Sequence, residues 1–273
     1  MDHPGAGMSL ITTSREELLD RTEVAFTRFR ELVADVPADI RVGDGTWLTS
    51  DVARHVVTVF RRYTERPWRS REGLSATVPE VTALNHADVE ALATLPRADL
   101  LDALDTEWEK YRALDITVDN TFPFHFGATI DGAGAMGNML AELLIHGYDT
   151  ATAAHRSWPI EDRDALLVLN AVFQIAPFLV HPERTARVRS VVEFRIGAGH
   201  PQVITIDRAH ARIEDAAAVG GRRDAIVAGP AAVVLLNLYQ RIGLVAATRR
   251  GVRLRGGRRP WVLVQFPNWF LVP

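Results

Sequence analysis

The most informative part of this chain is residues 141–149, which read AELLIHGYD. The periodicity of the region predicts a helix, and Glu142 and His146 lie four residues apart, so their side chains share one helix face. A carboxylate and an imidazole placed together can ligate a divalent metal, but two ligands alone do not make a site. A surface ion pair explains the same spacing, so both interpretations stay open at this point.

A third candidate ligand, His55, lies about 87 residues before Glu142, in the segment SDVARH of residues 50–55. In a helical bundle, a ligand on one helix and a Glu-x-x-x-His pair on another can converge in the core. Two histidines and one glutamate with open coordination positions are typical of a catalytic metal site. A hydrogen-bonded, partly buried histidine without a metal is the structural alternative for His55.

The first two-thirds of the chain has the apolar spacing of several long helices. Ser14 followed by Glu17 predicts a capped helix start, and this helix should extend to about Val36. Further helices are expected over 51–66 before Pro67, near 86–93, after Pro96, over 136–156 behind the Gly-rich residues 127–137, and over 161–180. The pattern predicts an up-and-down bundle with one longer crossover.

After Pro182 the apolar residues alternate, which is typical of strands with one buried face. Strands are expected at 188–196, 203–206, 211–213, 252–254 and 261–266, with a helix from Gly229-Pro230 to about Ile242. The expected fold class is therefore α followed by α+β, with domains at residues 1–183 and 184–273. The first part carries 29 acidic and 16 basic side chains, and the second carries 5 and 15, so their net charges have opposite signs.

Composition excludes several classes of protein. The 273 residues carry a formal charge of −3. They contain no run of 18 or more apolar residues, so no transmembrane helix is expected. The N-terminus lacks the pattern of a signal peptide, so a cytoplasmic protein without a membrane partner is expected. With no cysteine, the chain can form no disulfide, zinc finger or protein thiol nucleophile, and any sulfur chemistry needs an external thiol.

Two segments resemble a known family. Residues 45–56, GTWLTSDVARHV, are similar to the Trp-to-His opening of the DinB-like, mycothiol-dependent maleylpyruvate isomerase family. Residues 141–149 are similar to that family's Glu-x-x-x-His-Gly helix, and Ser157-Trp158-Pro159 continues the match. The resemblance implies a DinB-like up-and-down four-helix bundle, followed by a small sterol-carrier-like α+β domain.

The same resemblance implies a set of site residues. It places a divalent metal, usually zinc, on His55, Glu142 and His146, and it gives Asp149 a supporting acidic role beside the catalytic site. A family helix that ends in Gly-Arg matches Gln240-Arg241, so Arg241 becomes the candidate partner of a substrate carboxylate, and Gln240 stands where the family has glycine. The implied thiol cosubstrate is mycothiol.

The leading functional hypothesis is a metal-dependent enzyme that adds this thiol to a small electrophile, for example one that bears a carboxylate. Isomerisation of a maleylpyruvate-type double bond and S-transfer both fit, in a monomer or homodimer. The alternative is a non-catalytic protein that sequesters a small molecule, suggested by the apolar tail at residues 261–273 and by the Arg-rich segment before it. The Arg-rich residues 249–259 alternate with Val252 and Leu254, which favours a solvated strand face over nucleic-acid binding.

Overall fold

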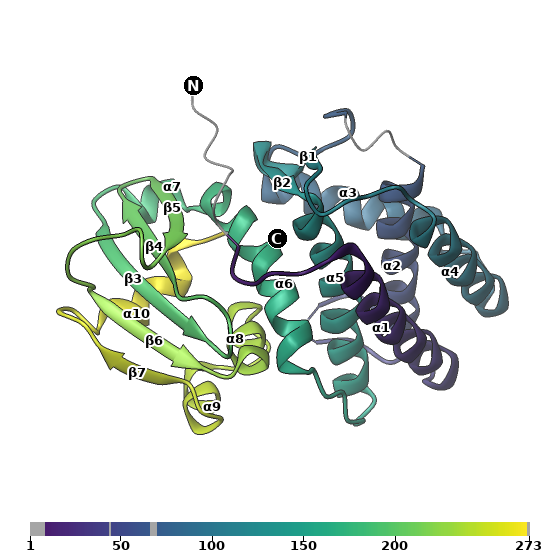
Figure 1. Ribbon diagram of the computed structural model, residues 1–273. Helices are drawn as coiled ribbons and strands as arrows, with labels where there is room; N and C mark the ends of the chain where they lie inside the picture. Colours follow the sequence, from purple (N-terminus) through teal and green to yellow (C-terminus); the bar gives the residue numbers. More distant parts are fainter. Residues whose placement is uncertain (1–8, 44, 66–69, 272–273) are drawn as a thin grey trace. The chain divides into compact units, whose positions relative to one another are not determined.

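The structure, a computed structural model, describes residues 9–43, 45–65 and 70–271 (Figure 1). The described chain divides into two compact units. The helical unit comprises residues 13–160, and the α+β unit comprises residues 9–12 together with 161–271. A short N-terminal segment therefore belongs with the C-terminal part of the chain.

Four long helices of the described chain build the helical unit: α1 (Arg15–Asp35), α2 (Thr49–Thr64), α4 (Arg97–Arg112) and α5 (Gly132–Ala153) (Figure 1). Their contacts close a ring, because α1 packs on α4 and α5, and α2 also packs on both. Phe26 stacks on Trp108 at 5.1 Å between ring centroids, and Phe60 meets both rings edge-on. The four expected long helices of this region are thus confirmed.

Smaller elements complete the helical unit. They are α3 (Val78–Ala91), β1 (Thr121–Pro123), the 3-10 turn η1 (His125–Gly127) and β2 (Thr129–Asp131). Part of the glycine-rich stretch lies inside α5 rather than before it, because Asp131 caps that helix: its Oδ1 accepts a hydrogen bond from Gly134 N at 2.6 Å. The expected stop of α2 at Arg66-Pro67 lies outside the described residues. No helix within the described ranges has the length and apolar character needed to cross a membrane.

A five-stranded sheet forms the centre of the α+β unit, in the order β5-β4-β3-β6-β7. The strands are β3 (Arg189–Ile196), β4 (Gln202–Asp207), β5 (His210–Asp215), β6 (Ala225–Gly229) and β7 (Arg253–Gly256). β3, β4 and β5 form an antiparallel meander, β6 runs parallel to β3, and β7 is antiparallel to β6. The strands expected at 188–196, 203–206, 211–213 and 252–254 are confirmed, whereas β6 was not anticipated.

Helix α6 (Asp162–Ile175) belongs to the α+β unit and not to the helical unit. It packs on α8 (Ala231–Leu238), and Phe173 meets Phe194 of β3 at 5.9 Å between ring centroids. The turn η2 (Ala176–Leu179) and the short helix α7 (Pro182–Thr185) lead from α6 into β3. The compact units consequently divide at residue 160, whereas the sequence pattern places the domain boundary at 183/184, because helical periodicity does not say which core a helix joins.

The C-terminal segment contradicts one expectation. Residues 261–266 form no strand; the chain makes α10 (Val262–Gln265) and the 3-10 turn η3 (Phe266–Trp269). Val262, Phe266 and Trp269 are buried, and their spacing of four and three residues is helical. Phe266 packs 5.4 Å from Phe194, so these apolar residues cover the sheet.

The helix expected from Gly229-Pro230 to Ile242 is shorter, since α8 ends at Leu238 and a separate helix, α9 (Leu244–Arg249), follows. Gln240 N donates to Asn237 O, and Arg241 N donates to Leu236 O at 2.8 Å, which is a Schellman motif. The motif requires a left-handed residue, and Gln240 has φ of +59°. The glycine of the resembled family therefore corresponds to a position that demands a positive φ.

We expect Gln240→Gly to stabilise the α+β unit by about 0.5–1 kcal/mol, because glycine avoids the left-handed penalty but loses more backbone entropy on folding. Urea unfolding at neutral pH measures this gain. Gln240→Ala is the matched control and should bring no gain, since alanine keeps the Cβ. A glycine variant no more stable than the alanine variant would contradict the strain argument.

Candidate metal centre

Three potential ligands meet inside the helical unit. His55 comes from α2, and Glu142 and His146 come from α5, and one ligand atom of each lies within 4.8 Å of the other two. His55 Nε2 and His146 Nε2 each lie 3.2 Å from the same oxygen, Glu142 Oε2. The two imidazole centroids are 4.9 Å apart. The structure thus brings together the three residues singled out in the sequence.

Local sequence explains the placement of His55. Asp51 caps the start of α2, because its Oδ2 accepts a hydrogen bond from Leu48 N at 2.9 Å. Arg54 Nη1 pairs with Asp51 at 2.7 Å and stabilises the same first turn. The flanking residues Val52 and Val56 are buried on the core face, and His55 is only 3% exposed. A buried imidazole in this position needs a polar partner, which Glu142 provides.

The electrostatics of the cluster favour an ionised Glu142 carboxylate and a neutral His55 imidazole. Burial opposes ionisation of Glu142, but hydrogen bonds from His146 and His55 outweigh it and hold the pKa of the carboxyl well below its usual range. Burial lowers the pKa of His55, against the attraction of Glu142. Ionised carboxylate and neutral imidazole are the protonation states in which these groups bind a metal.

The donor set fits a divalent cation. Two imidazole nitrogens and one carboxylate oxygen face a common point, which suits zinc and also other first-row ions. Metal-bound histidines usually donate their second ring N–H to an acceptor. His146 Nδ1 lies 3.9 Å from Asp149 Oδ2, whereas the buried His55 Nδ1 has no hydrogen-bond partner among the described residues. Asp149 therefore lies where a supporting acidic residue is expected.

Two aromatic side chains beside the cluster had no predicted role. The Trp47 ring lies 5.1 Å from His55 and 6.4 Å from His146, and it also meets His86 at 5.6 Å. Trp47 Nε1 lies within hydrogen-bond distance of His86 Nδ1, at 3.3 Å. The sequence contained a clue to Trp47, since this residue lies in the isomerase-like segment that contains His55. It contained no clue to His86, because only the tertiary packing of α3 on α2 brings that residue there.

The remaining candidate, Arg241, belongs to the α+β unit. It is exposed at the end of α8, and its Nη1 donates to Tyr239 O at 2.8 Å. The cluster of His55, Glu142 and His146 is therefore formed by the helical unit alone. The assignment of Arg241 to a substrate carboxylate stays a prediction.

A solved structure shares this architecture. A crystal structure of a mycothiol-dependent maleylpyruvate isomerase matches with a TM-score of 0.50 at 13% identity, covering 90% of this chain and 94% of that chain. The chain has the fold of that isomerase. A histidine-to-alanine mutant of a mycothiol-dependent maleylpyruvate isomerase matches with a TM-score of 0.47, 12% identity and the same coverage. A double mutant of a sec-alkyl sulfatase reaches only 0.35 at 12% identity, over 79% of this chain and 32% of that chain.

The sequence by itself finds no such match. No protein-family model fits it, and no curated protein matches it. The resemblance seen in residues 45–56 and 141–149 is thus supported by the isomerase fold, over most of the chain, at an identity too low for sequence comparison.

Gly147, next to His146 in the isomerase-like segment, has a packing reason. A Cβ at this position would overlap the six-membered ring of Trp158. That indole is fixed, because its Nε1 donates to Leu144 O at 3.0 Å and the Arg28 guanidinium lies 4.3 Å from the ring centroid. Glycine at position 147 and tryptophan at position 158 therefore depend on each other.

We expect Gly147→Ala to destabilise the helical unit by about 1–3 kcal/mol, since the overpacking cost exceeds the better helix propensity of alanine. Chemical denaturation of the single variants and of the Gly147→Ala/Trp158→Leu double variant measures the coupling. The alanine should be tolerated, or even stabilising, once the indole is gone. Equal effects of Gly147→Ala in both backgrounds would disprove the clash.

Proposed function

We propose that this chain is a divalent-metal-dependent enzyme that adds a low-molecular-weight thiol, mycothiol, to a small electrophile. The product is either an S-conjugate or, by addition and elimination, the isomer of a maleylpyruvate-type double bond. The observation that carries this proposal is the convergence of His55, Glu142 and His146 within 4.8 Å, in a chain with an isomerase fold. The proposed setting is the cytoplasm.

The architecture supports this reading. We interpret the ring of α1, α2, α4 and α5 as a DinB-like up-and-down four-helix bundle, and the α+β unit as a sterol-carrier-like domain. Ligands from two facing helices are a usual way to build a metal site in a bundle core. His55 on α2 and the Glu142–His146 pair on α5 follow this arrangement.

In the proposed mechanism, His55, Glu142 and His146 hold the ion, for which we favour Zn²⁺. When bound, such an ion lowers the pKa of a coordinated thiol and so supplies thiolate near neutral pH. The chain has no cysteine, so the sulfur comes from the cosubstrate. Glu142 contributes the negative charge of the ligand set, and Asp149 orients the His146 ring through Nδ1.

Two further residues have proposed roles in handling the substrate. Trp47 packs over both imidazoles and limits the access of water to the cluster. Arg241 offers a planar guanidinium for bidentate contact with a substrate carboxylate. The alternative of a non-catalytic binding protein stays open, because the apolar tail is only partly accounted for: Val262, Phe266 and Trp269 are buried in the α+β unit, whereas Trp261 and Val264 are exposed.

Thiol-dependent turnover tests the proposal. Purified protein is incubated with maleylpyruvate, or with a panel of small electrophiles, in the presence of mycothiol, of glutathione or of no thiol. We expect turnover with mycothiol that disappears on chelation and returns when Zn²⁺ is added back. Turnover that persists in fully metal-free protein would contradict the metal's role. Tight electrophile binding without turnover, unaffected by chelation, would favour the binding-protein alternative.

A further inference from the structure

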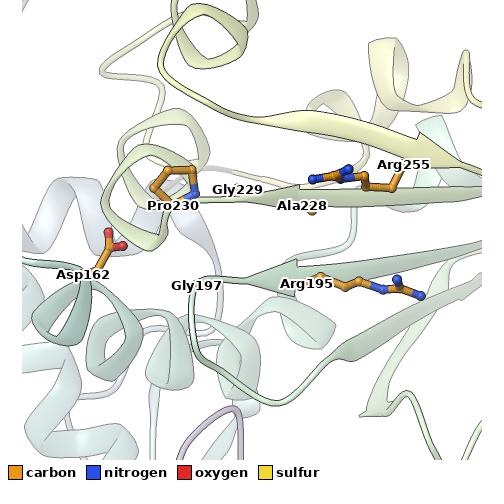
Figure 2. A pocket seen from close by; sticks show the side chains of 7 residues that line it. All are labelled: Asp162, Arg195, Gly197, Ala228, Gly229, Pro230 and Arg255. Atoms are coloured by element: carbon orange, nitrogen blue, oxygen red, sulfur yellow. The ribbon is translucent and has the colours of Figure 1, made fainter.

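A cavity of about 520 Å³ lies within the α+β unit, apart from the metal-ligand cluster. It is found where the parallel neighbours β3 and β6 end, a usual place for ligands in sheets with parallel strands. Its lining residues are Asp162, Arg195, Gly197, Ala228, Gly229, Pro230 and Arg255 (Figure 2). Most of these residues are small, so the two arginines provide the long polar side chains of the wall.

The sheet register places both arginines beside the same strand. Arg195 of β3 pairs with Ala228 of β6, and Ala228 pairs in turn with Arg253 of β7. Arg255 is the extra residue at the β6–β7 irregularity, where a bulge re-aims a side chain. Figure 2 shows Arg195 and Arg255 on the strands that flank Ala228. The methyl group of Ala228 leaves the space between them open.

The positive charge of the wall is incompletely neutralised. Among the described residues, Arg255 makes no ion pair and no side-chain hydrogen bond. Arg195 uses its Nε to contact Glu193 at 2.6 Å, and Glu193 also binds Arg223 at 2.9 Å, so one carboxylate serves two guanidinium groups. The terminal nitrogens of Arg195 have no recorded partner in the described chain.

Asp162, the carboxylate in the wall, forms no ion pair with either arginine among the described residues. Asp162 Oδ1 accepts a hydrogen bond from Ala232 N at 3.0 Å, so this side chain caps the first turn of α8. The positive partial charge of this helix terminus stabilises the carboxylate. Two guanidinium groups therefore face a cavity large enough for a small organic molecule.

We propose that this cavity binds a small anionic molecule through a carboxylate or phosphate group held between Arg195 and Arg255. Planar guanidinium groups match either oxyanion with paired N–H donors. The site goes beyond the proposed function and needs no metal, because its lining residues all belong to the α+β unit.

Calorimetric titration of the full chain at low ionic strength tests the site, with succinate, inorganic phosphate and the neutral succinamide as probes. We expect succinate or phosphate to bind, with Kd in the range of about 1 mM or below, and succinamide not to bind. Binding of succinate alone assigns a carboxylate ligand, and binding of phosphate alone assigns a phosphate ester. Chelated protein should give the same Kd, whatever the outcome of the turnover assay.

Matched variants locate the binding. Arg255→Gln should raise the Kd of the probe that binds by about tenfold or more, and Arg255→Lys should raise it less. Arg195→Gln should also raise the Kd. Arg187→Gln, an exposed arginine of the same unit outside the cavity, should change Kd by less than about twofold, as expected for a screened distant charge. Equal weakening in Arg187→Gln and Arg255→Gln, or no binding of either anion by the folded wild type, would overturn the proposal.

Discussion

Glu142→Gln is expected to leave the purified protein nearly free of metal while its helices persist. The substitution keeps the shape of the side chain but removes the negative charge that both imidazoles face at 3.2 Å. Changes in residues that only support metal ligands weaken metal binding by up to about 100-fold, so the loss of a direct ligand should weaken it by more than that. Elemental analysis after equilibration with Zn²⁺, on protein made without a metal-affinity tag, should show about one equivalent in the wild type only.

Three companion variants make this result specific. His55→Ala and His146→Ala should lose the metal as well, since the three donor atoms form one cluster. His210→Ala should retain it, because this exposed histidine lies on β5 in the other unit. Circular dichroism checks that α2 and α5 remain folded. Full metal occupancy in Glu142→Gln would refute the assignment, as would a wild type that takes up no metal.

The sequence predicted the local features of the helical unit because they depend on near neighbours. Ser14 accepts a hydrogen bond from Glu17 N at 3.1 Å, as its spacing indicates, and α1 follows directly. The pairing of α6 with the sheet could not be predicted in this way. It depends on tertiary packing such as that of Phe173 on Phe194 of β3, at 5.9 Å between ring centroids, which no local spacing indicates.

The candidate site shows the same division. Glu142 and His146 share a face through helical geometry alone, whereas His55 became the third candidate through the expected bundle, with the family resemblance in agreement. The position of His86 against Trp47 followed from no pattern, since it requires the fold of the segment between α2 and α4. The expectation of a strand at residues 261–266 is wrong because a short continuous apolar run fits a buried strand as well as a helix segment.

Asp224 is a buried carboxylate of the α+β unit, 1% exposed, with several hydrogen-bond partners. Its Oδ2 accepts hydrogen bonds from Val191 N at 3.0 Å and from Arg259 Nη2 at 2.8 Å, and its Oδ1 binds Arg259 Nε and, at 3.4 Å, Arg258. Asp224 N in turn donates to Val191 O at 2.7 Å. One side chain thus ties the start of β6 to β3 and to the segment after β7.

We expect Asp224→Ala to destabilise the α+β unit by about 3 kcal/mol, because it leaves the partly buried Val191 N without its acceptor and removes a bidentate ion pair. Hydrogen exchange of the amides in β3 and β6, or urea unfolding, measures the loss at pH 7. Asp207→Asn is the control: Asp207 pairs with Arg189 at 3.1 Å, but both side chains are more than half exposed. The control should cost less than about 1 kcal/mol, and equal losses would contradict the special role of Asp224.

The pH dependence of protein stability provides a second test of the role of Asp224. Hydrogen bonds from Arg259 lower the pKa of Asp224 in the folded protein, against the opposing effect of burial. A carboxyl whose folded pKa lies below its unfolded value of about 3.9 contributes its full stabilisation above that value, and the contribution is lost as the pH falls through the folded pKa. The stability gap between wild type and Asp224→Asn should therefore be constant above about pH 5 and narrow in more acidic solution. A gap of constant size down to pH values where the wild type itself unfolds would show that the lost stability comes from packing and not from the charge of Asp224.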